Sequence, residues 1–211
     1  NRVCAGELKQ VCERGNLDLT EAEYFAIIEG KTAALTECCG RLGALYAGAT
    51  EGVAERMGKF GRGLGLAFQI ADDLLDLVGN ERTAGKTLGT DLEQRKLTLP
   101  VIHCLNSLPQ MDAAKLRDAI RDGHADLGEG VLAALGKTHS VAYARRRAEE
   151  IARSARHELE CLPRSECRAL LEAMTEECVR RDNGEGPRQQ ANPVRVRPRI
   201  GPITPAAPPP L

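Results

Sequence analysis

Apolar residues recur along this chain at helical rather than strand spacing. Thr20 and Glu23 form the capping-box pattern T-x-x-E, which predicts the start of a helix. From there apolar side chains return about every 3.6 residues, so one helix is predicted through Gly48. The periodic apolar positions are Tyr24, Ile27, Ile28, Leu35, Leu42 and Leu45.

A second long helix is predicted for residues 51–79, where Gly79 would end it. A polar, glycine-containing loop follows, and Pro100 suits the first turn of the next helix. We found no strand pattern, so the predicted fold class is all-α. Shorter helices are expected near residues 112–122, 125–136, 138–160 and 164–181.

The composition changes at Asn183. The segment "NGEGPRQQANPVRVRPRIGPITPAAPPPL" holds eight of the eleven prolines of the chain. Such a segment cannot bury a core or continue a helix. We therefore predict a helical domain over residues 1–182 and a disordered, proline-rich tail over residues 183–211.

Charge and composition exclude several classes of function. The net charge is −1 and aromatic residues make up 3% of the chain, which argues against a nucleic-acid partner. No apolar run is long enough to span a membrane, and "NRVCAGELKQ" has no signal-peptide core, so a cytoplasmic protein is expected. The eight cysteines form no CxxC pair and are predicted to be reduced, mostly packing thiols.

The stretch "AFQIADDLLDLVG", residues 67–79, places an acidic stripe on an otherwise apolar helix. Gln69, Asp72, Asp73 and Asp76 stand at i, i+3, i+4 and i+7 and therefore share one face. A helix that is apolar on most sides belongs inside a bundle, where three carboxylates need a cation. Oxygen ligands of this kind suit Mg²⁺; the alternative is that the stripe faces water.

Cationic residues stand near this stripe in the sequence. Lys86 and Lys96 lie in the loop after the helix, and Lys31 lies beside Thr32 on the preceding one. A diphosphate held by magnesium and lysines would use this combination. The glycines on or near the acidic face, Gly58 and Gly65, either leave room for a ligand or permit close helix packing.

These motifs together resemble a known family. "FQIADDLLD" and "GKTLGTDLEQRKLTLPVI" are similar to the second aspartate-rich motif and following loop of the trans-isoprenyl diphosphate synthases, or polyprenyl synthetases. "GELKQ" and "KTAAL" also match family patterns, and the resemblance extends over residues 1–182. It implies a helical bundle around a central cavity, the isoprenoid synthase fold, with the N-terminal helices missing.

The resemblance also implies a chemistry. Family members use Mg²⁺ to condense isopentenyl diphosphate with an allylic diphosphate, and this chain is similar to members that make long-chain polyprenyl diphosphates. In this sequence the direct metal ligand would be Asp72, supported by Asp73 and Asp76. The diphosphate would be bound by Lys31, Lys86 and Lys96, the developing positive charge would face Thr32 and Gln69, and Gln10 would lie near the metal.

The chain also departs from the family pattern. It carries no first aspartate-rich motif, so it would hold half of an active site. An apolar bundle face and the resemblance both point to a homodimer or heterodimer. The main alternative is a non-catalytic subunit, or an inactive fragment, that pairs with a complete synthase. A terpene cyclase is disfavoured because its second metal motif usually mixes Asn, Ser or Thr, and Glu. A helical interaction module would leave the acidic stripe unexplained.

Overall fold

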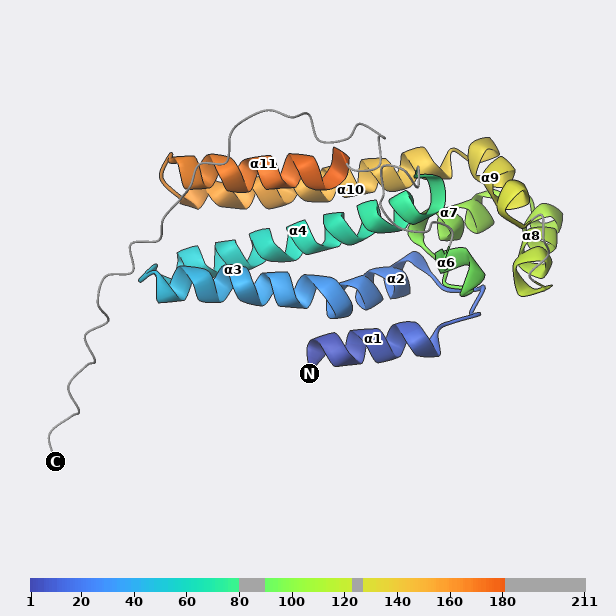
Figure 1. Cartoon of the computed structure of the whole chain (residues 1–211), viewed down its shortest axis with the longest axis horizontal. Helices are drawn as coiled ribbons and strands as arrows, with labels where there is room; N and C mark the ends of the chain where they lie inside the picture. The colour runs from blue at the N-terminus through green and yellow to red at the C-terminus, as the bar shows by residue number, and fades with distance from the viewer. Residues whose placement is uncertain (80–89, 123–126, 181–211) are drawn as a thin grey trace, which may run out of the picture.

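The computed structural model describes residues 1–79, 90–122 and 127–180, and these parts are all-helical, as predicted (Figure 1). Lys86 and the proline-rich tail, both named in the sequence predictions, lie outside the described residues. The elements are α1 (Arg2–Cys12), α2 (Glu21–Ile28), the π-helix η1 (Glu29–Ala33), α3 (Ala34–Tyr46), α4 (Glu51–Val78), α6 (Thr90–Glu93), α7 (Leu99–Ser107), α8 (Gln110–Asp122), α9 (Leu127–Lys137), α10 (Ser140–Glu158), the 3-10 turn η2 (Leu159–Cys161) and α11 (Glu166–Arg180).

The capping box at the start of α2 is confirmed. Thr20 Oγ1 accepts from the Glu23 backbone N–H at 3.2 Å, and the Glu23 carboxylate accepts from the Thr20 N–H at 2.9 Å. The long helix predicted through Gly48 is confirmed as an unbroken helical run from Glu21 to Tyr46, but it contains the π-helix η1 between α2 and α3. A π turn barely disturbs the apolar spacing of a long helix, so the sequence pattern did not reveal it.

Helix α4 is the centre of the fold. It runs between α3 on one side and α10 with α11 on the other, as Figure 1 shows, and contacts all three. Thr50 caps its first turn and the helix ends at Gly79, as the sequence predicted. The predicted loop that follows includes the short helix α6. The start of α7 is also confirmed, with Pro100 in its first turn.

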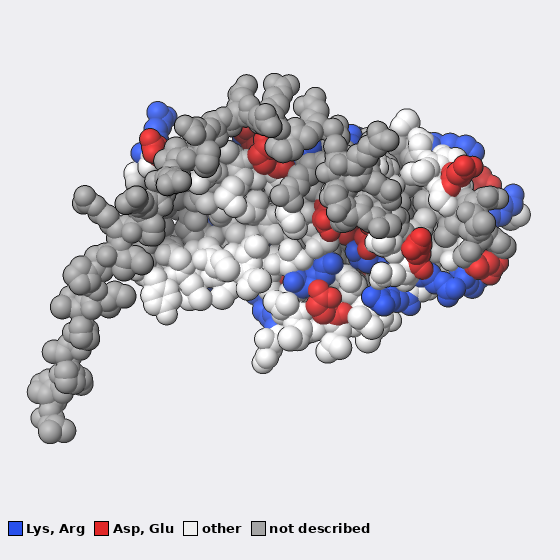
Figure 2. All heavy atoms as spheres, in the orientation of Figure 1, with Lys and Arg blue, Asp and Glu red and all other residues white. Residues whose placement is uncertain are grey.

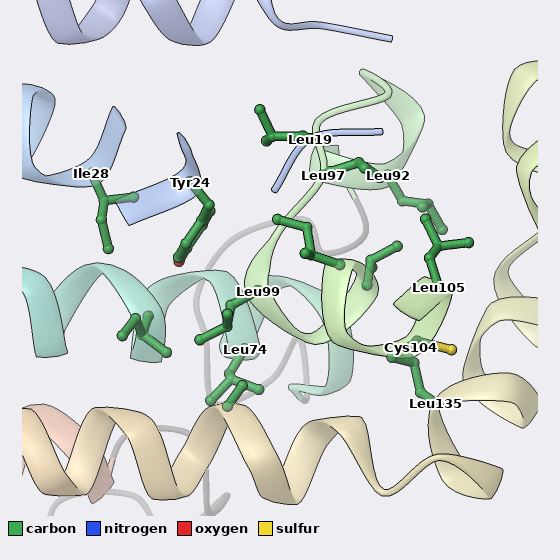
Figure 3. Packing of buried hydrophobic residues seen from close by; sticks show 14 of the residues in the cluster. Leu19, Tyr24, Ile28, Leu74, Leu92, Leu97, Leu99, Cys104, Leu105 and Leu135 are labelled. Atoms are coloured by element: carbon green, nitrogen blue, oxygen red, sulfur yellow. The ribbon is translucent and has the colours of Figure 1, made fainter. Parts of the chain in front are cut away.

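The main core lies where α2, α4 and α7 meet (Figure 3). Ile70 and Leu74 of α4 are 0% and 1% exposed, and they lie in one cluster with Leu99 of α7. Tyr24 of α2 is also buried there, with its hydroxyl end turned toward α4 in Figure 3. This core fixes the acidic half of α4 against α2, which carries the chain into η1.

The apolar stripe of the first long helix divides into a buried and an exposed half. The α2 positions Tyr24, Ile27 and Ile28 are buried, whereas Leu35 and Leu42 of α3 are 57% and 44% exposed. The α3 part of the apolar repeat is therefore largely exposed in this chain. In Figure 2 the visible surface over α3 and α4 is correspondingly broad and uncharged.

The cysteines are all free, as predicted, but most do not pack in the core. Cys104 and Cys178 are buried, whereas five others are exposed, so the expectation of packing thiols was wrong for those five: Cys4, Cys12, Cys38, Cys39 and Cys167. In the part of the chain that the structure describes, no helix has the length and apolar character needed to cross a membrane.

Leu74→Ala tests the central position of α4. The Leu74 side chain is 1% exposed within the main core, so its truncation should lower the free energy of unfolding by about 2–5 kcal/mol. Leu170→Ala is the matched control, because Leu170 of α11 is 66% exposed. Urea unfolding of the two variants should separate them clearly, and equal losses would contradict this placement of α4.

Candidate functional site

A buried carboxylate, that of Asp73, organises the acidic end of α4. Its Oδ2 accepts from the Tyr24 hydroxyl at 2.7 Å. Its Oδ1 accepts from the Gln69 side-chain amide at 3.0 Å and from the Lys96 ammonium at 3.1 Å. Asp73 is 1% exposed, so these three donors replace the water that a carboxylate would otherwise bind.

The hydrogen bonds continue from Gln69 to η1. The Thr32 hydroxyl donates to Gln69 Oε1 at 2.8 Å, which brings together the two residues predicted to face the reacting carbons. Beside Thr32, the Lys31 ammonium donates to Gln10 Oε1 of α1 at 2.9 Å. The π-helix thus presents consecutive side chains to two neighbours, α4 and α1.

Asp76 holds the beginning of α6 against α4. Its two carboxylate oxygens accept from the Thr90 hydroxyl at 3.0 Å and from the Asp91 backbone N–H at 2.9 Å. Lys96 links this group to the previous one, since its ammonium also donates to the Asp91 carboxylate at 2.8 Å. Asp73, Asp76, Asp91 and Lys96 therefore belong to one connected network.

Burial and charge shift the pKa values of this network. Burial, and next the charge of Asp73, raise the pKa of Tyr24 well above its ordinary value and also raise that of Asp91. Burial alone would lower the pKa of Lys96, but Asp73 and Asp91 outweigh it and the net shift is upward. Lys31 differs: burial, and then repulsion by Lys96, lower its pKa. The charges of Asp73, Glu7 and Asp91 oppose this shift but do not outweigh it, so Lys31 is a partly buried cation whose charged form is disfavoured.

Gly6 of α1 and Gly30 of η1 allow these two helices to approach each other closely, beside the Gln10–Lys31 contact. A Cβ built on Gly6 would lie 2.2 Å from the Lys31 backbone nitrogen and 2.6 Å from the carbonyl carbon of Gly30. A similar approach exists at Gly65, where a Cβ would lie 2.8 Å from the Ala33 Cα. Gly65 therefore permits close helix packing, and it also lines a pocket beside Lys31, so the structure is consistent with both roles considered for it.

A pocket of about 460 Å³ opens beside Lys31 and Thr32. Its walls come from η1, α3, α4 and α11, and they include the apolar side chains of Leu35, Phe68 and Met174 and, on α11, the carboxylate of Glu177. A second pocket of about 480 Å³ shares Thr36, Leu64 and Met174 with the first and is lined mainly by apolar and glycine residues of α3 and α4. The two pockets form an apolar trough with a polar, cationic end.

The three aspartates have different surroundings. Asp73 and Asp76 are buried with donors on their carboxylates, whereas Asp72 is only partly buried. Among residues 1–79, 90–122 and 127–180, no group of three or more His, Cys, Asp or Glu side chains is gathered as a metal site. Binding of one metal ion by all three aspartates stays a prediction. The partly buried Asp72 is the carboxylate whose position best fits metal binding.

Most of the predicted site residues come together. Lys31, Thr32, Gln69, Asp73 and Lys96 lie in or beside the connected network, and Gln10 joins it through Lys31. Tyr24 was counted only as a core residue because it falls on the apolar repeat. Its hydroxyl was the available signal, since a buried tyrosine usually hydrogen-bonds through that group.

Known proteins resemble this chain in sequence. The sequence profile of the family described as "Polyprenyl synthetase" matches residues 1–134. An octaprenyl diphosphate synthase of Haemophilus influenzae is 37% identical over 172 residues, which cover 81% of this chain and 52% of the relative. An octaprenyl diphosphate synthase of Escherichia coli is 36% identical over 183 residues, with 86% and 57% covered.

Solved structures show the same fold. A decaprenyl diphosphate synthase from Rhodobacter capsulatus superposes with a TM-score of 0.79 at 33% identity, over 85% of this chain and 56% of that one. A polyprenyl synthase from Caulobacter crescentus, complexed with calcium and isoprenyl diphosphate, gives a TM-score of 0.79 at 30% identity, over 84% and 55%. The chain therefore spans about half the length of the relatives that it matches.

Gly6→Ala tests the approach of α1 to the π-helix. The added Cβ would meet backbone atoms that cannot move aside, so we expect a loss of about 1–3 kcal/mol in the free energy of unfolding. Gly43→Ala is the control, because a Cβ there meets no atom within 4 Å and should stabilise α3 by about 0.5–1 kcal/mol. Urea unfolding measures the free energy of unfolding of both variants. A Gly6→Ala chain as stable as the Gly43→Ala control would contradict the close contact between α1 and η1.

Proposed function

This chain belongs to the polyprenyl synthetase family, and from that premise we propose that it forms part of a prenyltransferase. The reaction joins isopentenyl diphosphate to an allylic diphosphate and gives a long-chain polyprenyl diphosphate. The main support for the proposal is the apolar trough with Lys31 at one end. An allylic diphosphate has the matching form, because it is an anionic head on an apolar chain. The relatives named for octaprenyl and decaprenyl products support the long-chain assignment.

Lys31 is the proposed ligand of the diphosphate. Its ammonium lines the pocket and donates to a neutral amide, Gln10, rather than to a carboxylate. Burial, and next repulsion from Lys96, lower its pKa despite the opposing charges of Asp73, Glu7 and Asp91, so a bound anion would add an attraction that favours the charged ammonium. Lys96 acts from farther away, since Asp73 and Asp91 already hold its ammonium. Lys86, the third predicted ligand, remains a prediction.

The apolar part of the trough suits the prenyl chain. Leu35, Phe68 and Met174 would cover it and exclude water from an allylic cation formed when diphosphate leaves. At the polar end, the oxygens of Thr32 and Gln69 are the protein groups proposed to face that positive charge. The two halves of the trough thus match the two halves of the substrate.

Magnesium is the proposed cofactor, with Asp72 as its ligand from this chain. Such an ion is commonly held by one or two carboxylates with substrate phosphates and water, and it would neutralise the charge of the leaving diphosphate. We propose a supporting role for Asp73 and Asp76. Asp73 holds Gln69 and Lys96, while Asp76 holds α6, so both fix the frame around Asp72.

A non-catalytic subunit is the second candidate. It is favoured by the exposed apolar face of α3 and by the half-length match to the relatives. In that case Leu35 and Leu42 would pack against a second prenyl synthetase chain, which would supply the first aspartate-rich motif in a heterodimer. A homodimer and a cytoplasmic location fit the first candidate. The two candidates differ in whether turnover depends on Asp72.

Asp72→Asn tests the proposed enzyme. The native protein would be isolated with an antibody against residues 140–180, and incorporation of labelled isopentenyl diphosphate into farnesyl diphosphate would be measured with magnesium. We expect the variant, expressed in the same cells, to lose about a hundredfold or more in turnover, since metal stabilisation of the leaving group is worth several kcal/mol. Asp118→Asn is the control, because that carboxylate pairs with Arg121 on α8.

The outcomes separate the candidates. Loss of turnover in Asp72→Asn but not in Asp118→Asn supports the enzyme. Equal turnover of the wild-type protein and Asp72→Asn, in a complex that contains a complete synthase, would instead support the non-catalytic subunit. Absence of turnover in every preparation, with no binding of farnesyl diphosphate by the wild-type chain, would contradict both.

A further inference from the structure

The Gln69 amide is held in one orientation. An ionised carboxylate can only accept hydrogen bonds, whereas a primary amide has a donating NH₂ and an accepting carbonyl. Asp73 therefore requires Gln69 to direct Nε2 toward it, at 3.0 Å. The Gln69 carbonyl is then turned to Thr32, whose hydroxyl donates to it at 2.8 Å. The direction of both hydrogen bonds follows from the charge of Asp73.

This direction decides what Thr32 offers to the pocket. A threonine hydroxyl has one hydrogen and two lone pairs. The hydrogen is directed to Gln69 Oε1, and Thr32 lines the pocket of about 460 Å³. The pocket wall at this point therefore presents an acceptor, and not a donor, to whatever lies beside it. An electron-poor carbon is the kind of group that such lone pairs stabilise.

Tyr24 keeps Asp73 in place. Its hydroxyl bonds to Oδ2 at 2.7 Å, whereas Gln69 and Lys96 share the other oxygen, Oδ1. Within the described parts of the chain, Tyr24 is the single donor to Oδ2. Without that hydroxyl, Oδ2 would be a buried acceptor with no donor, a costly state that rotation of the carboxylate would relieve. Rotation would release the Gln69 amide.

We propose that Tyr24 is a positioning residue, which acts through Asp73 and Gln69 to keep the Thr32 hydroxyl an acceptor toward the pocket. Its chemical purpose, stabilising positive charge on a prenyl carbon, rests on the function proposed above. The orientation itself does not, because it depends only on contacts within this chain. Tyr24 lies behind the pocket wall, so its effect on a substrate is indirect.

Nuclear magnetic resonance of the Gln69 side-chain amide tests the proposal on the chain itself. Tyr24→Phe keeps the buried ring and removes the hydroxyl. We expect exchange of the Gln69 NH₂ protons with water to accelerate by about tenfold, the factor that one hydrogen bond of ordinary net strength represents. Tyr143→Phe is the matched control, because it removes a tyrosine hydroxyl that donates to Glu21 at 2.8 Å on another part of α2. Unchanged Gln69 exchange in Tyr24→Phe would overturn the proposal.

A second measurement needs no variant. A scalar coupling across the hydrogen bond should connect Gln69 Nε2 with Asp73 Cγ in the unmodified chain, and its absence would also overturn the proposal. In a preparation with prenyl transfer, Tyr24→Phe should lower kcat about tenfold at constant KM, and Tyr143→Phe should change neither. A rise in KM alone would contradict the positioning role. Absence of prenyl transfer would defeat the proposed function, while the amide spectra would still decide the role of Tyr24.

Discussion

The buried carboxylate of Asp73 is the constraint on which the rest of this structure depends. An isolated carboxylate inside a helical bundle would be strongly unfavourable, and here three donors compensate it. They come from three different places: Tyr24 from α2, Gln69 from α4 and Lys96 from the segment between α6 and α7. The same charge therefore fixes the relative positions of these segments and sets the polar end of the trough. In this chain the core and the candidate site are one arrangement.

The opposite end of the trough exposes apolar side chains, whereas the polar end buries a charge. Apolar side chains of α3, including Leu35 and Leu42, are exposed, although monomeric proteins rarely leave large apolar surfaces uncovered. The chain spans about half the length of its relatives, so the surface has room for a further segment or a second chain. The described side chains at the polar end are held by hydrogen bonds within the chain, whereas apolar side chains of α3 at the other end are exposed.

The sequence predicted the frame of the fold because its signals are local. The capping box at Thr20, the length of α4 and the start of α7 at Pro100 each follow from residues a few positions apart. The shared face of Gln69 and Asp73 also followed from helical spacing, and the structure joins them by a hydrogen bond. What escaped prediction depends on contacts between distant segments. The Tyr24–Asp73 hydrogen bond links residues 49 positions apart. Apolar periodicity assigns Tyr24 to the core but does not predict the hydrogen-bond partner of its hydroxyl.

A crystal structure with an allylic diphosphate and Mn²⁺, an anomalous scatterer that substitutes for magnesium, tests the central claim most directly. We expect an anomalous peak bound to Asp72 and to diphosphate oxygens, with the Tyr24 hydroxyl still within hydrogen-bond distance of Asp73. A peak bound directly by Asp73, with the bonds to Tyr24 and Lys96 broken, would contradict this expectation. In that case Asp73 would be a metal ligand held in reserve by its protein donors, and not the fixed support of the site.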